Sequence, residues 1–595
     1  MSRIEDTWDL TKLYDNDSEW EKDFALLTDM AEDIDGYKGR LSEAEKLLDY
    51  LKFNDQLNMK LERLGLYANL KSEEDVTVSA YLAMNGRLES RIAEIMGRQA
   101  FFVPEILSHT DEEIETMIDN CRGLEEYRFF LSDIMRTRPH VLNQDSEELL
   151  AYASDCMSAA GSACHILQDS DMVFDDVIDE NGEPQQLTEG TYSVFSQSEQ
   201  RQVRKDAFEK LFEGYGRFAN TFCSLLTSSV KVSVFEADVR HYGSAVEASL
   251  SDDNIPVDVY RNTVDSTCKG LKSLQRYVTL KKKLLGLDSF HLYDLNAPLV
   301  PAGDVAHIDF DRGVEMITGA LEPMGDEYIR QFNKGIHSRW VDRYPKKGKA
   351  SGAFSSGGYG TMPYVLMNYN GKDEDVLTLA HEMGHSMHTW YSTGTQPFVY
   401  SNYSLFCAEV ASVTNETIVS RYLTDHAENK NRRVTLIDLQ LGQIRGTLFR
   451  QVMFAEFELY IHDAVEKGMQ PTTDEINEFW HELNMKYYGT DMIIDDCSNV
   501  EWARIPHFYS DFYVYQYATG YAAANAFAEK IVHGTREDLD RYKGFLKSGC
   551  SDYPVSILKK AGVDLTMPEP FDSVIRRFDG LMDELEEIYY GSERH

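Results

Sequence analysis

Apolar residues recur at helical spacing along most of this 595-residue chain. The first 170 or so residues are rich in Leu, Glu, Lys, Ala and Met and contain few helix breakers. Within them, the segment Ser42–Phe53 places apolar residues at positions 47, 48, 51 and 53, along one face of a helix. We therefore expect the chain to begin with a bundle of antiparallel helices.

The helical pattern is interrupted between residues 172 and 188. Asn181-Gly182 stands there between short apolar runs, an arrangement typical of a β-hairpin. Helical spacing resumes near residue 195 and continues to about residue 287. We expect an N-terminal helical domain over residues 1–195 that carries this hairpin, and a second domain over residues 196–595.

A second change of pattern comes between residues 336 and 370, where Gly, Tyr and Ser are frequent. Tyr364–Tyr369 is a strand candidate, and the glycines of Gly352–Gly360 indicate a flexible loop. A peptide lying along an exposed strand edge gains backbone hydrogen bonds whatever its sequence, so this strand could serve as a substrate shelf. An ordinary small sheet with a glycine turn is the alternative.

An H-E-x-x-H motif follows directly, as His381-Glu382-Met383-Gly384-His385. Residues four apart lie on one face of a helix, so both imidazoles can bind one metal ion while Glu382 reaches a water molecule on that ion. This arrangement is typical of a zinc hydrolase, so we expect residues 196–595 to form the catalytic domain. With 16 His and 100 acidic residues a chance match is the alternative, so the surrounding sequence has to decide.

The third ligand is not supplied by the longer H-E-x-x-H-x-x-G-x-x-H pattern, since His388 and Tyr391 occupy the positions where that pattern requires Gly and His. Catalytic zinc usually takes three protein ligands and one water. Glu409, which follows His385 by 24 residues in mostly apolar surroundings, is the candidate. Glu416 lies two helical turns further on the same face, where it can accept a hydrogen bond from a ligand histidine.

Composition narrows the possible partners and location. The formal net charge of −41 argues against nucleic acid, because binding phosphate requires basic stripes. The eight cysteines show no C-x-x-C spacing, which indicates reduced thiols rather than disulfides or a cysteine metal site. The acidic start lacks the features of a signal peptide, and no segment approaches about eighteen uninterrupted apolar residues. We expect a cytoplasmic protein without membrane contact; the sequence carries no signal for oligomeric state.

The motif and its surroundings resemble the M3 family of zinc oligopeptidases, to which thimet oligopeptidase belongs. His381–His388, Ala408–Ser412 and Glu416 carry this likeness. The segments similar to the oligoendopeptidase F group of that family are Thr7–Tyr14, Gly352–Ser355, Pro363–Asn368 and Ile505–Tyr509. The likeness covers nearly the whole chain. It implies a mainly α, two-lobed, zincin-like fold with a deep substrate channel, a small β-sheet near the active site, one zinc ion per chain and cytoplasmic cleavage of oligopeptides.

The resemblance also implies roles for individual residues. His381, His385 and Glu409 match the family's zinc ligands, and Glu382 matches its general base. His507 matches a histidine that contacts the reacting carbonyl group. The segment expected to bind substrate contains Gly352, Ala353, Phe354, Gly357, Gly358 and Tyr359.

Tyrosine hydroxyls stabilise the oxyanion in this family, but alignment from His507 leaves Tyr513, Tyr515 and Tyr517 open. Tyr517 and Tyr513 rank first, because residues four apart share a helix face.

Three functions fit these features. The first is an endopeptidase that hydrolyses internal bonds of short peptides with a zinc-bound water activated by Glu382. The second is an exopeptidase that removes dipeptides, which needs a fixed cationic group for the substrate carboxylate; the sequence offers no unique candidate. The third is a non-catalytic peptide-binding protein, against which the complete set of ligands and Glu382 argue.

Overall fold

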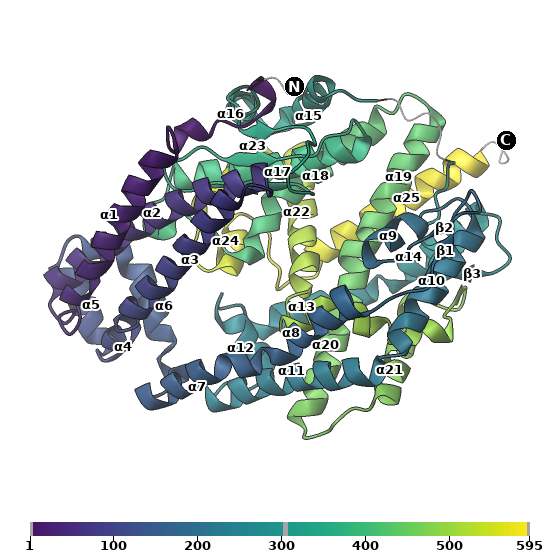
Figure 1. Cartoon of the computed structure of the whole chain (residues 1–595). Helices are drawn as coiled ribbons and strands as arrows, with labels where there is room; N and C mark the ends of the chain where they lie inside the picture. Colours follow the sequence, from purple (N-terminus) through teal and green to yellow (C-terminus); the bar gives the residue numbers. More distant parts are fainter. Residues whose placement is uncertain (1–3, 302–306, 592–595) are drawn as a thin grey trace. The chain divides into compact units, whose positions relative to one another are not determined.

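The computed structural model describes residues 4–301 and 307–591 and is mainly helical (Figure 1). Its described strands form three small sheets. The predicted mainly α class with a small sheet is therefore confirmed. Within these residues, none of the helices combines the length and the apolar character that crossing a membrane requires.

The chain forms two compact units, each assembled from three separate segments. Unit 1 consists of Met1–Pro139, Ala306–Val419 and Phe527–Gly562, and unit 2 consists of His140–Val305, Ser420–Ala526 and Val563–His595. The boundary predicted at residue 195 lies inside unit 2. It divides the chain by sequence order whereas the units group segments by packing, so that boundary stays a prediction.

Unit 1 opens with long helices around a core of apolar side chains. The side chain of Asn16 accepts the N–H of Ser18 and so begins the first helix. Trp20 is fully buried and donates its indole N–H to the carbonyl of Leu64, which ties this helix to the second. The helices of unit 1 are α1 (Asp17–Asp33), α2 (Ala44–Glu74), α3 (Ser79–Gln99), α4 (Phe102–Leu107), α5 (Asp111–Asn120), α6 (Arg128–Arg136), α15 (Phe310–Ala320), α16 (Asp326–His337), α17 (Asp373–Thr393), α23 (Arg536–Ser548) and α24 (Pro554–Lys560).

A three-stranded sheet completes unit 1, in the order β4 (Val341–Asp342), β6 (Tyr364–Leu366), β5 (Phe354–Ser356). β4 runs parallel to β6, and β5 runs antiparallel to it. The strand predicted at 364–369 is present as β6, and its three residues are fully buried because the side chains of Tyr364 and Leu366 join the core around the first three helices.

Unit 2 is a second helical body with two minimal sheets. β1 (Val177–Ile178) pairs antiparallel with β2 (Pro184–Gln185), within the range of the predicted hairpin, and β3 (Phe290–His291) pairs parallel with β7 (Met492–Ile493). The helices of unit 2 are α7 (Gln144–Met157), α8 (Ala159–Ile166), α9 (Glu189–Phe195), α10 (Arg201–Gly216), α11 (Ala219–Val239), α12 (Ala245–Ser251), α13 (Val257–Lys269), α14 (Leu271–Leu284), α19 (Lys430–Ile444), α20 (Arg450–Glu466), α21 (Thr473–Tyr488) and α25 (Glu569–Tyr590).

Two further helices, α18 (Leu405–Asp425) and α22 (Tyr515–His533), contribute residues to both units.

Candidate active site

The H-E-x-x-H motif lies in the middle of α17. This helix begins where the carboxylate of Asp375 accepts the main-chain N–H groups of Asn370 and Lys372, at 3.0 and 2.9 Å. Asp373, Glu374 and Asp375 place negative charge in its first turn, where the helix dipole favours it. Apolar residues such as Met383 form the buried face of α17. The two histidines of the motif lie half-buried on a different face of the helix.

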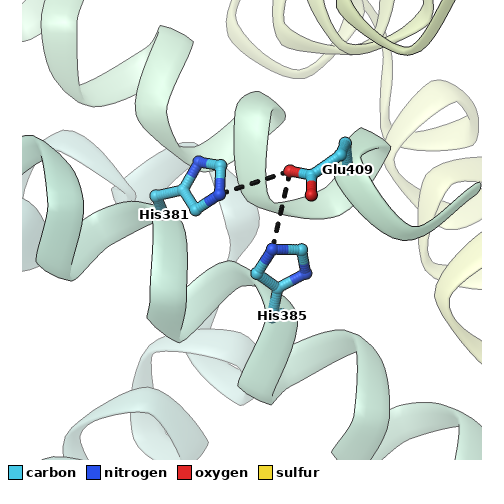
Figure 2. Close-up of side chains that lie close together, drawn as sticks. All are labelled: His381, His385 and Glu409. Atoms are coloured by element: carbon cyan, nitrogen blue, oxygen red, sulfur yellow. Dashed lines mark ion pairs between the residues drawn. The ribbon is translucent and has the colours of Figure 1, made fainter. Parts of the chain in front are cut away.

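Glu409 of α18 meets both histidines of α17. Its Oε2 lies 3.3 Å from Nε2 of His381 and 3.6 Å from Nε2 of His385 (Figure 2). One donor atom from each residue lies within 4.8 Å of the others, and all three side chains are half-buried. Across residues 4–301 and 307–591, this is the one group of three or more His, Cys, Asp or Glu side chains close enough to hold a metal ion.

Glu416 contacts the His381 ring at the nitrogen that does not face Glu409. Its Oε2 lies 3.0 Å from Nδ1 of His381, so the ring's other nitrogen is presented to Glu409. The Oγ of Ser412 in turn donates to Oε2 of Glu409 at 3.1 Å. Because carboxylates behind ligand histidines fix their tautomer and orientation, this arrangement is typical of a metal site.

The electrostatics of this cluster favour a positive charge between its side chains. Burial disfavours a charge on His381, but its hydrogen bonds to Glu409 and Glu416 outweigh burial and raise the pKa of His381 to about 10. Burial would raise the pKa of Glu409, yet the hydrogen bonds from both histidines hold it well below its usual value. A positive charge between these side chains is therefore stabilised, whether a proton or a metal ion supplies it.

Glu382 is buried beside this cluster, with 7% of its surface exposed. Burial raises the pKa of Glu382, while the charges of His381 and His385 partly oppose the shift. A carboxylate whose pKa lies nearer neutrality is a better proton acceptor and donor at physiological pH.

The strand at an edge of the sheet is β5 rather than β6. β6 lies between β4 and β5, so the strand predicted as a substrate shelf has both edges occupied, and that prediction is wrong. Val365 donates its N–H to Trp340 at 2.8 Å and pairs in register with Ser355. Because hydrogen-bonded and non-hydrogen-bonded pairs alternate in antiparallel strands, the main chain of Ser355 points away from β6. β5 is therefore the strand edge that a peptide could join.

The predicted loop at 352–360 is partly this strand, and it is anchored to the motif helix. The hydroxyl of Ser355 lies 2.8 Å from that of Ser386, one residue beyond His385. Further along, Tyr359 donates its N–H to the Glu62 carboxylate at 2.7 Å. A Cβ atom at Gly358 would come within 2.9 Å of the Glu62 side chain, so a larger residue at this position would displace that carboxylate.

His507 and two of the three candidate tyrosines form a cluster in unit 2. The Tyr517 hydroxyl lies 3.2 Å from Nε2 of His507, and the Tyr513 and Tyr517 rings meet edge to face at 5.4 Å. Tyr515 instead is 1% exposed and packs against Tyr260. The structure thus separates Tyr515 from the other two.

The prediction that Tyr513 and Tyr517 share a helix face is wrong, although their rings are in contact. α22 begins at Tyr515, so Tyr513 lies before the helix and shares no helix face with Tyr517. The loop before α22 brings the Tyr513 ring into contact with Tyr517.

Comparison with known proteins agrees with this site. The profile of peptidase family M3 matches residues 194–577, and that of oligopeptidase F matches residues 105–174. The chain belongs to peptidase family M3. It is 40% identical over 587 residues to oligopeptidase PepF of Bacillus subtilis (strain 168), which covers 98% of this chain and 88% of that protein.

Solved structures support the same family membership. A Chlamydophila abortus protein whose crystal structure is assigned to a peptidase shares a TM-score of 0.91 and 34% identity over 99% of both chains. Oligoendopeptidase-F from Enterococcus faecium shares a TM-score of 0.75 and 34% identity over 97% of this chain and 100% of that chain. This M3 peptidase is accordingly a metalloendopeptidase that acts on peptides.

The residues that break the longer zinc motif have other roles in this M3 peptidase. His388 is buried, and its ring stacks on Tyr403 at 3.8 Å. Burial lowers the pKa of His388 to about 3, so it stays neutral. Tyr391 is also buried and packs against Tyr328. Neither residue belongs to the metal-binding group.

Two residues that sequence reasoning missed bring α18 close to α17. A Cβ atom at Gly384 would lie 2.6 Å from Cα of Ser412. Asn415 is fully buried, donates to the carbonyl of Ala380 at 3.3 Å and accepts from the Tyr328 hydroxyl at 2.9 Å. A glycine between the two histidines of a helical motif was the available signal for this close approach.

Proposed function

We propose that this M3 peptidase is a zinc-dependent oligoendopeptidase that hydrolyses internal bonds of short peptides and uses one zinc ion per chain. The observation that carries the proposal is the group of His381, His385 and Glu409 with Glu382 beside it. Two imidazoles and one carboxylate are a usual ligand set of catalytic zinc, and their partial exposure leaves access for water and substrate. The carboxylate of Glu416 behind His381 fits the same role.

The side chains around this site supply the proton transfers. A zinc ion held by the three ligands would act as a Lewis acid toward water and the scissile carbonyl. Glu382 accepts the proton of the attacking water and returns it to the leaving amine. Burial raises its pKa toward the working pH, which favours a group that has to take and give a proton in turn.

His507, Tyr517 and Tyr513 are proposed to stabilise the charge that develops on the carbonyl oxygen. The contact between the Tyr517 hydroxyl and His507 supports a common function. Partial burial lowers the pKa of His507, so its imidazole is neutral at pH 7 and one ring nitrogen carries a proton to donate. Fixed donors of this kind are most effective when they strengthen their hydrogen bonds in the transition state.

The substrate backbone is proposed to pair with β5 beside α17. The outward main chain of Ser355 supplies a donor and an acceptor, and the hydroxyl contact with Ser386 holds the strand near His385. Backbone pairing places the peptide without strong side-chain selection. The glycine-rich segment around Gly357 and Tyr359 would flank the bound peptide. A channel that limits substrate length and a cytoplasmic location stay predictions.

A peptide digest tests the proposal. The purified protein is incubated with a mixed library of short peptides, with and without a metal chelator, and the products are mapped by mass spectrometry. Internal cuts that the chelator abolishes and added zinc restores are expected. Matched peptides with amidated C-termini should be cut at similar rates. A strict requirement for a free C-terminus would replace the endopeptidase with a dipeptide-removing exopeptidase, and rapid digestion of native lysozyme would contradict a size-limited site.

A further inference from the structure

The loop between His507 and Tyr517 contains a strained residue. Phe512 has a φ of +53°, in the left-handed region that bulky L-residues rarely adopt. It is also 1% exposed, so its ring cannot relax into solvent. Such a conformation persists only where the surroundings hold it, and it concentrates at functional sites.

Glu458 of α20 holds the strained residue by its main chain. Its Oε1 accepts the N–H of Phe512 at 3.0 Å, and the side chain is 1% exposed. Its Oε2 has no hydrogen-bond partner among the residues that the structure describes. Burial raises the pKa of Glu458 well above its usual value, which disfavours a negative charge at this position. A core carboxyl with one unpaired oxygen is unfavourable for stability, yet its one hydrogen bond reaches the strained peptide.

Neighbouring contacts fix the same peptide from two helices. One turn beyond Glu458, the His462 ring packs 4.3 Å from the Phe512 ring, and its Nε2 faces Oδ1 of Asp511 at 3.6 Å. From α12, the Ser249 hydroxyl donates to the carbonyl of Asp511 at 2.7 Å. Both ends of the Asp511–Phe512 peptide are therefore held before the chain reaches Tyr513.

The anchored loop determines where the tyrosine rings stand. The Phe512 and Tyr515 side chains both pack on Tyr260 in the core, at 5.6 and 4.8 Å between ring centres. Tyr513 and Tyr517 flank these buried residues and contact each other and His507 instead. A different conformation at Phe512 would rotate the peptide that precedes Tyr513 and move its ring.

We propose that Glu458 is a positioning residue, which holds Phe512 in its left-handed conformation and thereby sets Tyr513 and Tyr517 against His507. The inference rests on the proposed function of this cluster in transition-state stabilisation. It assigns to Glu458 an effect on turnover rather than on peptide binding, since no contact of Glu458 with substrate is involved.

A double-mutant cycle tests this role. Glu458→Leu is made alone and together with the pair Tyr513→Phe and Tyr517→Phe, and kcat, KM, zinc content and melting temperature are measured for each. We expect Glu458→Leu to lower kcat about tenfold or more with KM changed less than about twofold and zinc content unchanged. In the background that carries both Tyr513→Phe and Tyr517→Phe, the same change should lower kcat by less than about twofold, because the hydroxyls that it displaces are already gone. Glu458→Gln keeps the acceptor and should restore most of the turnover.

Glu456→Gln on the same helix is the matched control. The Glu456 carboxylate accepts from the Tyr487 hydroxyl and does not contact the loop, so kcat should be unchanged. If Glu458→Leu fails to fold, Glu458→Met enters the same cycle. Full turnover in the folded variant, or losses that multiply with those of the Tyr513→Phe and Tyr517→Phe pair, would overturn the role of Glu458 alone. Unchanged kcat in Tyr513→Phe, Tyr517→Phe and His507→Ala would overturn the cluster's function and the inference with it.

Discussion

Gly384 of α17 lies directly against the main chain of Ser412 of α18. A Cβ atom at position 384 would come within 2.6 Å of Cα of Ser412 and 2.9 Å of the carbonyl oxygen of Ala411. These are backbone atoms, which cannot rotate aside as a side chain would. The absence of a side chain at Gly384 therefore lets α18 bring Glu409, three residues before Ser412, to both histidines.

Gly384→Ala should push the two helices apart and weaken metal binding. We expect the free energy of unfolding to fall by about 1–3 kcal/mol, as for other overpacked sites, with zinc affinity reduced as well. Chelator competition and thermal unfolding measure the two effects. Gly86→Ala is the control: its Cβ would meet nothing within 4 Å, so it should keep full zinc affinity and be neutral or slightly stabilising. Unchanged zinc affinity in Gly384→Ala would show that the two helices accommodate the added methyl group without moving Glu409.

Glu382→Gln should keep its metal and lose most of its turnover. The amide cannot accept the proton of the attacking water, while both imidazoles remain in place. Loss of a general base typically lowers kcat by about 10²–10⁴-fold. Zinc content by atomic absorption and peptide cleavage by mass spectrometry separate the two properties. Near-normal cleavage by the fully loaded variant would remove Glu382 from the role of base.

Glu409→Ala should weaken metal binding more than Glu416→Ala. The first change removes a ligand, whereas the second removes only the carboxylate that orients His381, a type of loss that usually costs about 10–100-fold in affinity. Competition with a chelator gives both affinities. Equal affinity for Glu409→Ala and the parent would transfer the ligand role to another residue.

Metal binding should release protons near neutral pH. In the metal-free protein the pKa of His381 is raised from 6.5 to about 10, so the ring carries a proton throughout that range, and a metal ligand must give it up. The apparent zinc affinity should therefore rise as the pH is raised from neutral toward about 10. The raised pKa also stabilises the metal-free fold, fully below about pH 6.5 and decreasingly as pH rises through 10. Calorimetry at pH 8 in buffers of different ionisation enthalpy should detect at least about one released proton; none would contradict the assignment.

Ser355→Pro should impair substrate binding through the β5 edge. The N–H at this position points away from β6, so proline removes a donor for the peptide without breaking the pairing with Val365. A lost hydrogen bond of this kind corresponds to roughly a 3–10-fold rise in KM. Ser355→Ala loses only the hydroxyl contact with Ser386 and is the control. Identical KM values for the two variants would place the substrate elsewhere.

The metal-binding group could be predicted from sequence because its geometry is largely local. His381 and His385 share one face of α17 by their spacing, and Glu409 with Glu416 share one face of the next helix. Only the crossing of the two helices required tertiary structure. The helices themselves could be predicted from apolar periodicity, which persists over long segments such as the 31 residues of Ala44–Glu74.

Short strands and strained loops could not be predicted in the same way. β5 has three residues and forms inside a glycine-rich segment because β6 offers it a partner, which no local propensity records. The order of the strands also decides which strand lies at the edge of the sheet. That order depends on a long-range hydrogen bond, in which the carbonyl of Trp340 accepts the N–H of Val365. The left-handed Phe512 is set by Glu458, a residue 54 positions away in sequence.

The segments of the two units alternate along the chain, which has consequences for synthesis of the chain and for cutting it into fragments. Each unit draws on three segments, so no single cut releases either one whole. During synthesis, the last metal-binding side chain is added at residue 409. The helix α23, whose Phe545 packs against His388 behind the motif, begins only at Arg536. A nascent chain or fragment that ends before Arg536 would expose the back of the motif helix while already carrying all of its ligands.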